Sequence, residues 1–186
     1  MRGFAVALVL GLGVLAIAAQ NSAFAADEDN TIYMQLKGGK VVIQLRPDIA
    51  PKHVARVKKL AKEKFFDGIV FHRVIDGFMA QSGDPTGTGT GGSKYPDLLA
   101  EFSSAPFKTG TIGAARTSDP NSANSQFFIC FTDSSCAHLQ GQYTVWGQVV
   151  EGMEHVNALK KGAPGSGIVP APDKILRMQL ASDAKG

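Results

Sequence analysis

Two short stretches decide the fold of this 186-residue chain: residues 71–84, FHRVIDGFMAQSGD, and residues 125–129, SQFFI. The first contains parts of two short apolar runs, at residues 69–75 and 78–81, that are joined at Asp76-Gly77. Short apolar runs that are bounded by turn residues are typical of β-strands. A loop rich in Gly, Thr, Ser, Asp and Pro follows at residues 82–94. This part of the chain therefore reads as strands that carry a long connecting loop.

The flanking sequence contributes further strands and two helices. Residues 31–36 alternate in polarity, a Gly-Gly turn follows, and residues 41–45 form a second strand, so a β-hairpin is predicted. Apolar residues at helical spacing predict an amphipathic helix at residues 53–64 and a shorter helix at 154–160. Additional strands are predicted at residues 109–115, 126–131, 143–150 and 175–180. Many short strands with only two helices and no alternating β-α-β order predict a mainly β, antiparallel, closed or nearly closed barrel.

The N-terminal stretch differs from the rest of the chain. Arg2 precedes a nearly continuous apolar run at residues 4–19, and Ala23-Phe24-Ala25 follows. A charged start, an apolar middle and a small-x-small ending are typical of a secretory signal peptide, so we expect cleavage after Ala25. The alternative is an uncleaved membrane anchor, although the run is short for a spanning helix of about 20 residues. We expect residues 26–186 to form one exported domain, periplasmic or secreted, that does not contact the membrane.

Charge and motifs exclude several functions. Without residues 1–25 the chain has 18 basic and 16 acidic residues, a net charge of +2 with no dense basic run, so no nucleic-acid partner is expected. The chain has no H-E-x-x-H and no G-x-S-x-G motif. Residues 87–92 match G-x-G-x-x-G, but they lie in a loop without the strand and helix that a dinucleotide site needs. The four histidines are scattered, so we expect neither a metal nor any other cofactor.

The two cysteines, Cys130 and Cys136, leave two interpretations open. Export would place them in an oxidising compartment, where a disulfide across a short loop would add modest stability. Alternatively, Cys130 is a buried strand thiol and Cys136 a loop thiol.

At residues 71–84 and 125–129 the sequence resembles the cyclophilin family of peptidyl-prolyl isomerases. The family pattern F-H-R-x-I-x-G-F-M-x-Q-x-G-D, followed about forty residues later by S-Q-F-F-I, is very specific. Weaker landmarks at residues 89–92, 110–113 and 145–149 occur in the matching order, and the resemblance covers about residues 30–182. It implies a closed eight-stranded antiparallel β-barrel that is capped by two α-helices.

The resemblance also implies a site. Arg73 is its catalytic side chain, Gln81 holds Arg73 and contacts the substrate backbone, and Tyr143 stands where many members have a histidine. The substrate-binding residues that it implies are Phe78, Met79, Gln81, Ala115, Arg116, Gln126, Phe128, Leu139 and Tyr143. Phe127 and Phe128 alternate along one strand, so we assign Phe128 to the pocket and Phe127 to the interior.

One departure from the family concerns inhibition. Members that are sensitive to the cyclic peptide cyclosporin often carry Trp just before the pocket Leu, whereas His138 holds that position here. We therefore expect weak cyclosporin binding, because the indole face and its N–H donor are missing.

The predicted function is peptidyl-prolyl cis–trans isomerisation in unfolded or flexible proline-containing exported proteins. Two alternatives remain open from the sequence. One is a binding module or chaperone that uses the proline groove with turnover incidental, and the other is a β-barrel carrier of a small apolar ligand. No exposed heptad or long apolar edge suggests assembly, so we expect a monomer.

Overall fold

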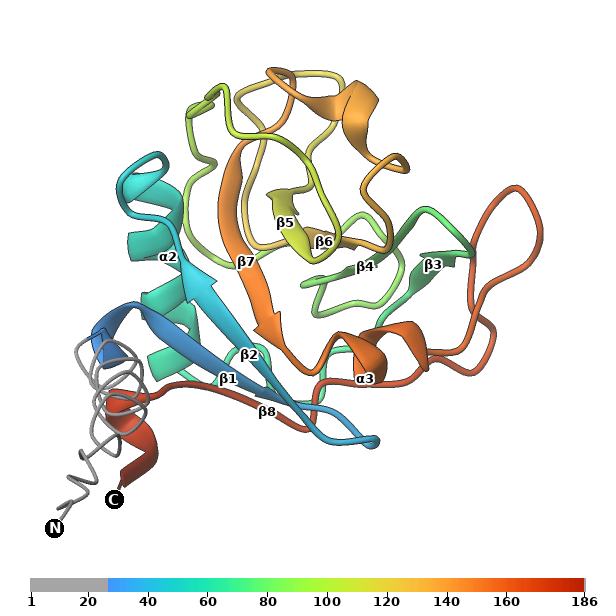
Figure 1. The fold of residues 1–186 in the computed structure, drawn as a ribbon, viewed down its shortest axis with the longest axis horizontal. Coiled ribbons are helices and arrows are strands. Elements are labelled where there is room, and N and C mark those ends of the chain that lie inside the picture. The colour runs from blue at the N-terminus through green and yellow to red at the C-terminus, as the bar shows by residue number, and fades with distance from the viewer. Residues whose placement is uncertain (1–26, 186) are drawn as a thin grey trace, which may run out of the picture.

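The computed structural model describes residues 27–185, so the predicted signal segment lies outside the described residues. This part of the chain folds into short β-strands, two α-helices and three 3-10 turns (Figure 1). The strands are β1 Thr31–Gln35, β2 Lys40–Leu45, β3 Arg73–Ile75, β4 Met79–Ser82, β5 Thr111–Ala114, β6 Phe127–Cys130, β7 Val145–Glu151 and β8 Arg177–Leu180. The helices are α2 Pro51–Lys62 and α3 Met153–Asn157, with 3-10 turns η1 Glu28–Asn30, η2 Ala137–Leu139 and η3 Ser182–Lys185.

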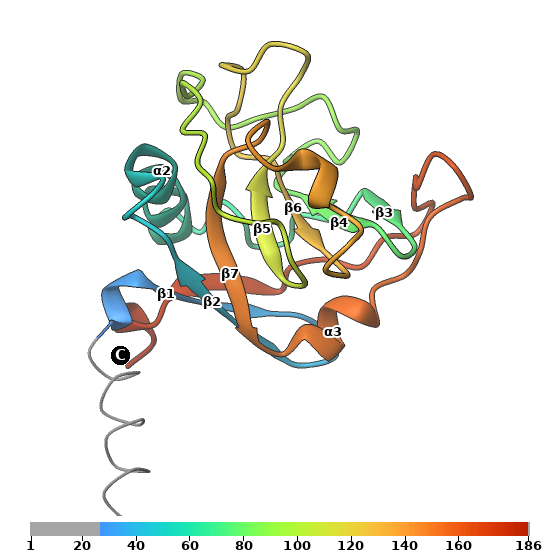
Figure 2. The same ribbon diagram turned by 45° about the horizontal axis from the view of Figure 1, so that its top comes forward.

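The eight strands form one curled antiparallel sheet in the order β3-β4-β6-β5-β7-β2-β1-β8. Helix α2 packs against β7 and β8, and α3 lies beside β2 (Figures 1 and 2). The mainly β class with two α-helices is confirmed. Within residues 27–185, no helix has the length and apolar character required to cross a bilayer.

The barrel is less fully closed than predicted. The end strands β3 and β8 do not pair with each other, and residues 162–175, the seam, lie along β3 instead. The amide of Val74 donates to the Gly167 carbonyl at 2.7 Å, and the amide of Val169 donates to the His72 carbonyl at 3.1 Å. Isolated bridges extend this contact at Arg73 and at Val70. The eight-stranded sheet is therefore closed by an irregular segment rather than by a ladder of two strands.

Strand alternation divides the apolar residues between two clusters. The barrel core fills the interior, where the Phe127 ring lies edge-on to Phe66 and Trp146 with centroids 5.9 and 5.7 Å apart. This filled interior argues against the carrier interpretation. The outer cluster lies on the other face of the sheet and comprises Met79, Phe107, Phe128, Cys130, Cys136 and Val145.

Helix α2 begins two residues earlier than predicted, at Pro51. Proline is favoured in the first turn because its fixed φ suits a helix and the missing N–H would have no partner there. The carboxylate of Glu101, 48 residues away from His53, accepts the amides of Lys52 and His53 at 3.0 Å each. Because this cap comes from a distant loop, local sequence patterns do not reveal it.

Candidate active site

Arg73 lies on β3 with its side chain on the outer face of the sheet, because its neighbour Val74 occupies the barrel core. Its Nε donates to the Ser166 carbonyl at 3.1 Å and its Nη1 donates to Gln81 Oε1 at 3.3 Å. Gln81 is the cross-strand partner of Arg73 on β4. Nη2 makes no hydrogen bond within residues 27–185, so the guanidinium is held from two sides with donors to spare.

Nine of the ten predicted site residues, Arg73 among them, line one pocket of about 290 Å³. The exception is Gln126, and His138 completes the lining. The apolar walls come from β4, β6 and the loop after β6, whereas Arg73 and Gln81 lie at the polar side. The pocket thus combines apolar walls with a guanidinium that is held by two hydrogen bonds.

The ring of Phe128 is fixed by its neighbours on the outer face. It stacks on Phe107 with centroids 5.8 Å apart and meets Tyr143 edge-on at 5.6 Å. Its cross-strand partner is Gly113, and a Cβ at that position would lie 2.4 Å from Phe128 Cζ. Glycine at 113 therefore leaves the space that the ring occupies.

A chain of amide groups leads away from Arg73. Gln81 Nε2 donates to Gln126 Oε1 at 2.9 Å, and Gln126 Nε2 donates to the Gly89 and Gly91 carbonyls at 3.0 and 2.9 Å. Gln126 lines an adjoining pocket of about 450 Å³ that shares Gln81, Ala115 and Arg116 with the first. The structure therefore places Gln126 beside the apolar slot, in the adjoining pocket, and ties it to the 82–94 loop.

Asp84 organises this loop and was not singled out from the sequence. Its carboxylate accepts the Thr86 amide and hydroxyl at 2.7 and 2.8 Å and the Gly89 amide at 2.6 Å. Burial alone would raise the pKa of Asp84, but the hydrogen bonds from Thr86, Gly91 and Gly89 lower it to about 2. The Asp in a Gly/Thr-rich loop is a signal of an Asx-type turn that could have identified it.

Arg116 does not project freely into the groove. Its guanidinium lies over the Tyr143 ring, 4.3 Å from the centroid. Its Nη1 donates to the Thr117 carbonyl at 2.8 Å and its Nη2 to the Gln142 carbonyl at 2.9 Å. Arg116 thus braces the Tyr143 wall of the pocket.

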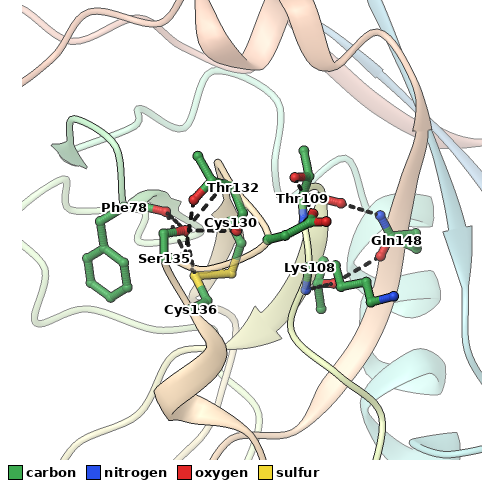
Figure 3. Close-up of a disulfide and its surroundings, with 10 residues drawn as sticks. Phe78, Lys108, Thr109, Cys130, Thr132, Ser135, Cys136 and Gln148 are labelled. Atoms are coloured by element: carbon green, nitrogen blue, oxygen red, sulfur yellow. Dashed lines mark hydrogen bonds between the residues drawn. A yellow bond between two sulfur atoms is a disulfide. The ribbon is translucent and has the colours of Figure 1, made fainter.

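The loop after β6 supplies the remaining wall. Cys130 and Cys136 form a disulfide with a Cα–Cα distance of 6.1 Å, which decides between the two interpretations of the cysteines (Figure 3). His138 and Leu139 on η2 follow directly, and the His138 ring lies 5.6 Å from that of Phe78. Among residues 27–185, no group of three or more His, Cys, Asp and Glu side chains could hold a metal ion.

Comparisons with known proteins agree with this geometry. A family model described as "Cyclophilin type peptidyl-prolyl cis-trans isomerase/CLD" matches residues 31–180. A protein of Brucella suis named "Probable peptidyl-prolyl cis-trans isomerase" is 52% identical over 183 residues, 92% of each chain. Peptidyl-prolyl cis-trans isomerase B of Bacillus subtilis is 40% identical over 127 residues, 67% of this chain and 86% of its own.

Solved structures give the same result. A cyclophilin from Hirschia baltica superposes with a TM-score of 0.75 at 28% identity, covering 84% of this chain and 76% of its own. A cyclophilin-type isomerase from Cryptosporidium parvum, solved in the presence of the dipeptide Ala-Pro, gives a TM-score of 0.73 at 25% identity and covers 81% of this chain and 98% of its own.

Proposed function

Because this chain belongs to the cyclophilin-type peptidyl-prolyl cis-trans isomerase family, which needs no cofactor, we propose that Arg73 is the catalytic side chain that speeds rotation about the X–Pro bond. The observation that carries the proposal is the guanidinium held at the polar side of an apolar pocket of about 290 Å³. The pocket takes the proline ring of an unfolded or flexible polypeptide.

The chemistry requires differential binding rather than a covalent step. The planar amide resists rotation with a barrier of about 18–20 kcal/mol. A rate of about 100 per second corresponds to a barrier near 15 kcal/mol, so the site must supply about 3–5 kcal/mol. In the twisted transition state the prolyl nitrogen regains its lone pair. A donor fixed beside that nitrogen stabilises the twisted form more than either planar form.

Arginine suits this role because it stays charged and presents a rigid planar set of donors. Ser166 and Gln81 hold the guanidinium, so little reorganisation is needed when the lone pair forms. The apolar walls, Phe128 and Leu139 among them, hold the pyrrolidine ring while the preceding carbonyl turns. Gln81 and Gln126 offer amide groups to the substrate backbone along the adjoining pocket.

The test is an isomerisation assay with a proline-containing peptide on residues 26–186. Arg73→Ala should lower kcat/KM by about 10²–10³-fold, the usual loss when a preorganised donor is removed, with an unchanged melting temperature. Arg73→Lys should recover only part of the rate, because an ammonium lacks the planar fork. A rate in Arg73→Ala equal to wild type would remove Arg73 from the mechanism.

We also propose that the enzyme acts as a monomer on exported proteins, in the periplasm or outside the cell, after cleavage at Ala25. The signal-like residues 1–25 and the Cys130–Cys136 disulfide support this setting, because disulfides persist in oxidising compartments. Cell fractionation with N-terminal sequencing tests the location and the cleavage, and light scattering tests the mass. A cytoplasmic protein that retains residues 1–25 would contradict the proposal.

Weak cyclosporin binding is the last part of the proposal. The imidazole of His138 beside Phe78 offers a smaller face than an indole would. Inhibition of the wild type at nanomolar cyclosporin would contradict it.

A further inference from the structure

His138 and Leu139 form one wall of the pocket, and few hydrogen bonds join this wall to the rest of the protein. Every hydrogen bond made by residues 136–139 stays within residues 134–142, for example Leu139 N to the Cys136 carbonyl at 2.9 Å. Cys136 Sγ lies 3.8 Å from the Phe78 carbonyl, but a disulfide sulfur has no proton to donate, so this approach is not a hydrogen bond. Polar contacts alone therefore do not fix these residues to the barrel.

The disulfide supplies the missing tie. Cys130 is the last residue of β6, two positions after Phe128, and Cys136 directly precedes η2, which carries the wall (Figure 3). One covalent link thus joins the strand of one pocket wall to the turn of the other. The Cα atoms that it joins are 6.1 Å apart.

The disulfide lies in the apolar cluster against which the pocket walls pack. Both cysteines are fully buried in the outer cluster, where Cys130 is the cross-strand partner of Met79. Leu139 packs against this same cluster. A shift of Cys136 would therefore move Leu139 relative to Met79, which lines the same pocket.

The rest of the loop is held differently. Ser135 Oγ contacts the Phe78 carbonyl at 3.1 Å, and Asp133 Oδ1 accepts the Thr109 amide and hydroxyl at 2.9 and 2.6 Å. These contacts attach residues 131–135 to the barrel. Beyond Leu139, the Gln140 side chain donates to the Ser104 carbonyl at 3.1 Å, and Arg116 donates to the Gln142 carbonyl at 2.9 Å. Between these anchors, the disulfide and apolar packing tie the pocket-lining residues 136–139 to the barrel.

We propose that Cys130 and Cys136 are positioning residues for the proline pocket: their disulfide sets the distance between the Leu139 wall and the Phe128 wall, and thereby the affinity for the proline ring. Arg73 lies on β3 and is held by Ser166 and Gln81, outside this loop. Loss of the link should therefore weaken substrate binding and leave the chemical step nearly unchanged. The inference rests on the proposed use of this pocket for proline.

Reduction by a small dithiol such as dithiothreitol provides the direct test. Two thiol–disulfide exchanges break the S–S bond, leave both cysteines as thiols and convert the dithiol to its cyclic disulfide. We expect KM to rise about tenfold, the scale set by incomplete burial of one aliphatic side chain, with kcat within about twofold of the oxidised enzyme. Re-oxidation should restore KM.

Two variants make the test specific. Cys130→Ala/Cys136→Ala should show the raised KM at all times and no response to dithiothreitol. Asp133→Ala, which loosens the outer end of the same loop with the disulfide intact, should keep the wild-type KM. If the double variant does not fold, oxidised and reduced wild type are compared by amide hydrogen exchange, and faster exchange at residues 137–139 with β6 unchanged is expected.

A further arm separates this inference from the role of Arg73. The dissociation constant of a proline peptide is measured by NMR in Arg73→Ala, with and without dithiothreitol. A weaker constant after reduction supports the positioning role whatever Arg73→Ala does to turnover. An unchanged constant, or a KM in folded reduced enzyme equal to that of the oxidised form, would overturn it.

Discussion

Phe127 and Phe128 are neighbours on β6 that serve opposite faces of one sheet. The Phe127 ring lies in the barrel core against Trp146, whereas the Phe128 ring lies in the outer cluster against Phe107 and Tyr143. The side-chain period of two along a strand produces this division. One ring thus packs in the barrel core and its neighbour lines the pocket, so we expect substitutions to separate stability from the proposed substrate binding.

The largest expected effect is on the interior face. Phe127→Ala should lower the free energy of unfolding by about 3–5 kcal/mol, because it removes a buried ring and leaves a cavity. Chemical denaturation measures the loss, and the activity per folded molecule should stay near that of wild type.

Phe128→Ala should instead lower activity more than it lowers stability. We expect a fall in kcat/KM of about 10²-fold, since the ring is a pocket wall and its removal costs binding on the scale of one buried aromatic side chain. If Phe127→Ala reduces the activity of folded molecules more than Phe128→Ala does, the division between the two faces is wrong.

The next largest expected effect is on the pH dependence of stability, through Asp84 in the loop at residues 82–94. The pKa of Asp84 is lowered to about 2 in the folded protein, against an ordinary value of 3.8, so its ionised form contributes about 2 kcal/mol of stability above pH 4. Because the folded-state pKa is depressed, this contribution is lost as the pH falls from about 4 to about 2. Denaturant titrations at several pH values should show a shallower decline in Asp84→Asn than in wild type. An equal decline would contradict the assignment.

A pair of glycines offers a sharper comparison of the two faces. Gly113→Ala places a methyl group 2.4 Å from Phe128 Cζ, so the ring must move and kcat/KM should fall about tenfold. Gly147→Ala is the matched control, because its Cβ would meet Ile43 Cγ2 at 3.2 Å in the barrel core. We expect the control to lose stability and to retain its activity, as measured by thermal denaturation and by the peptide assay.

The smallest expected effect concerns the inhibitor. His138→Trp should tighten cyclosporin binding by about threefold to tenfold, the usual contribution of one favourable aromatic contact. The inhibition constant of both proteins measures it. Unchanged inhibition would mean that another residue of the pocket limits the affinity.

Local patterns in the sequence predicted most of the architecture. Alternation and the Gly-Gly turn located the hairpin of β1 and β2, and helical periodicity located α2. These features depend on residues that are close in sequence or that share a strand face, and such relations are readable from a single chain. The site residues were instead implied by the family resemblance, and nine of those ten line one pocket.

Long-range contacts were not predictable in the same way. The Glu101 cap of α2, the stacking of Phe107 on Phe128 and the irregular seam join residues far apart in the chain. None of them follows a period or a short motif. The bracing of Tyr143 by Arg116 was also missed, because the direction of a long side chain is decided by its neighbours in space.

The seam links the orientation of Arg73 to the stability of one edge of the sheet. The same segment that covers β3 also supplies the Ser166 carbonyl that orients Arg73. An irregular edge held by scattered hydrogen bonds is the kind of region that opens by local unfolding before the rest of a protein does. Activity should therefore be lost at a lower denaturant concentration than the concentration at which the Trp146 signal changes. Loss of activity would then report local unfolding of the seam before global unfolding of the barrel.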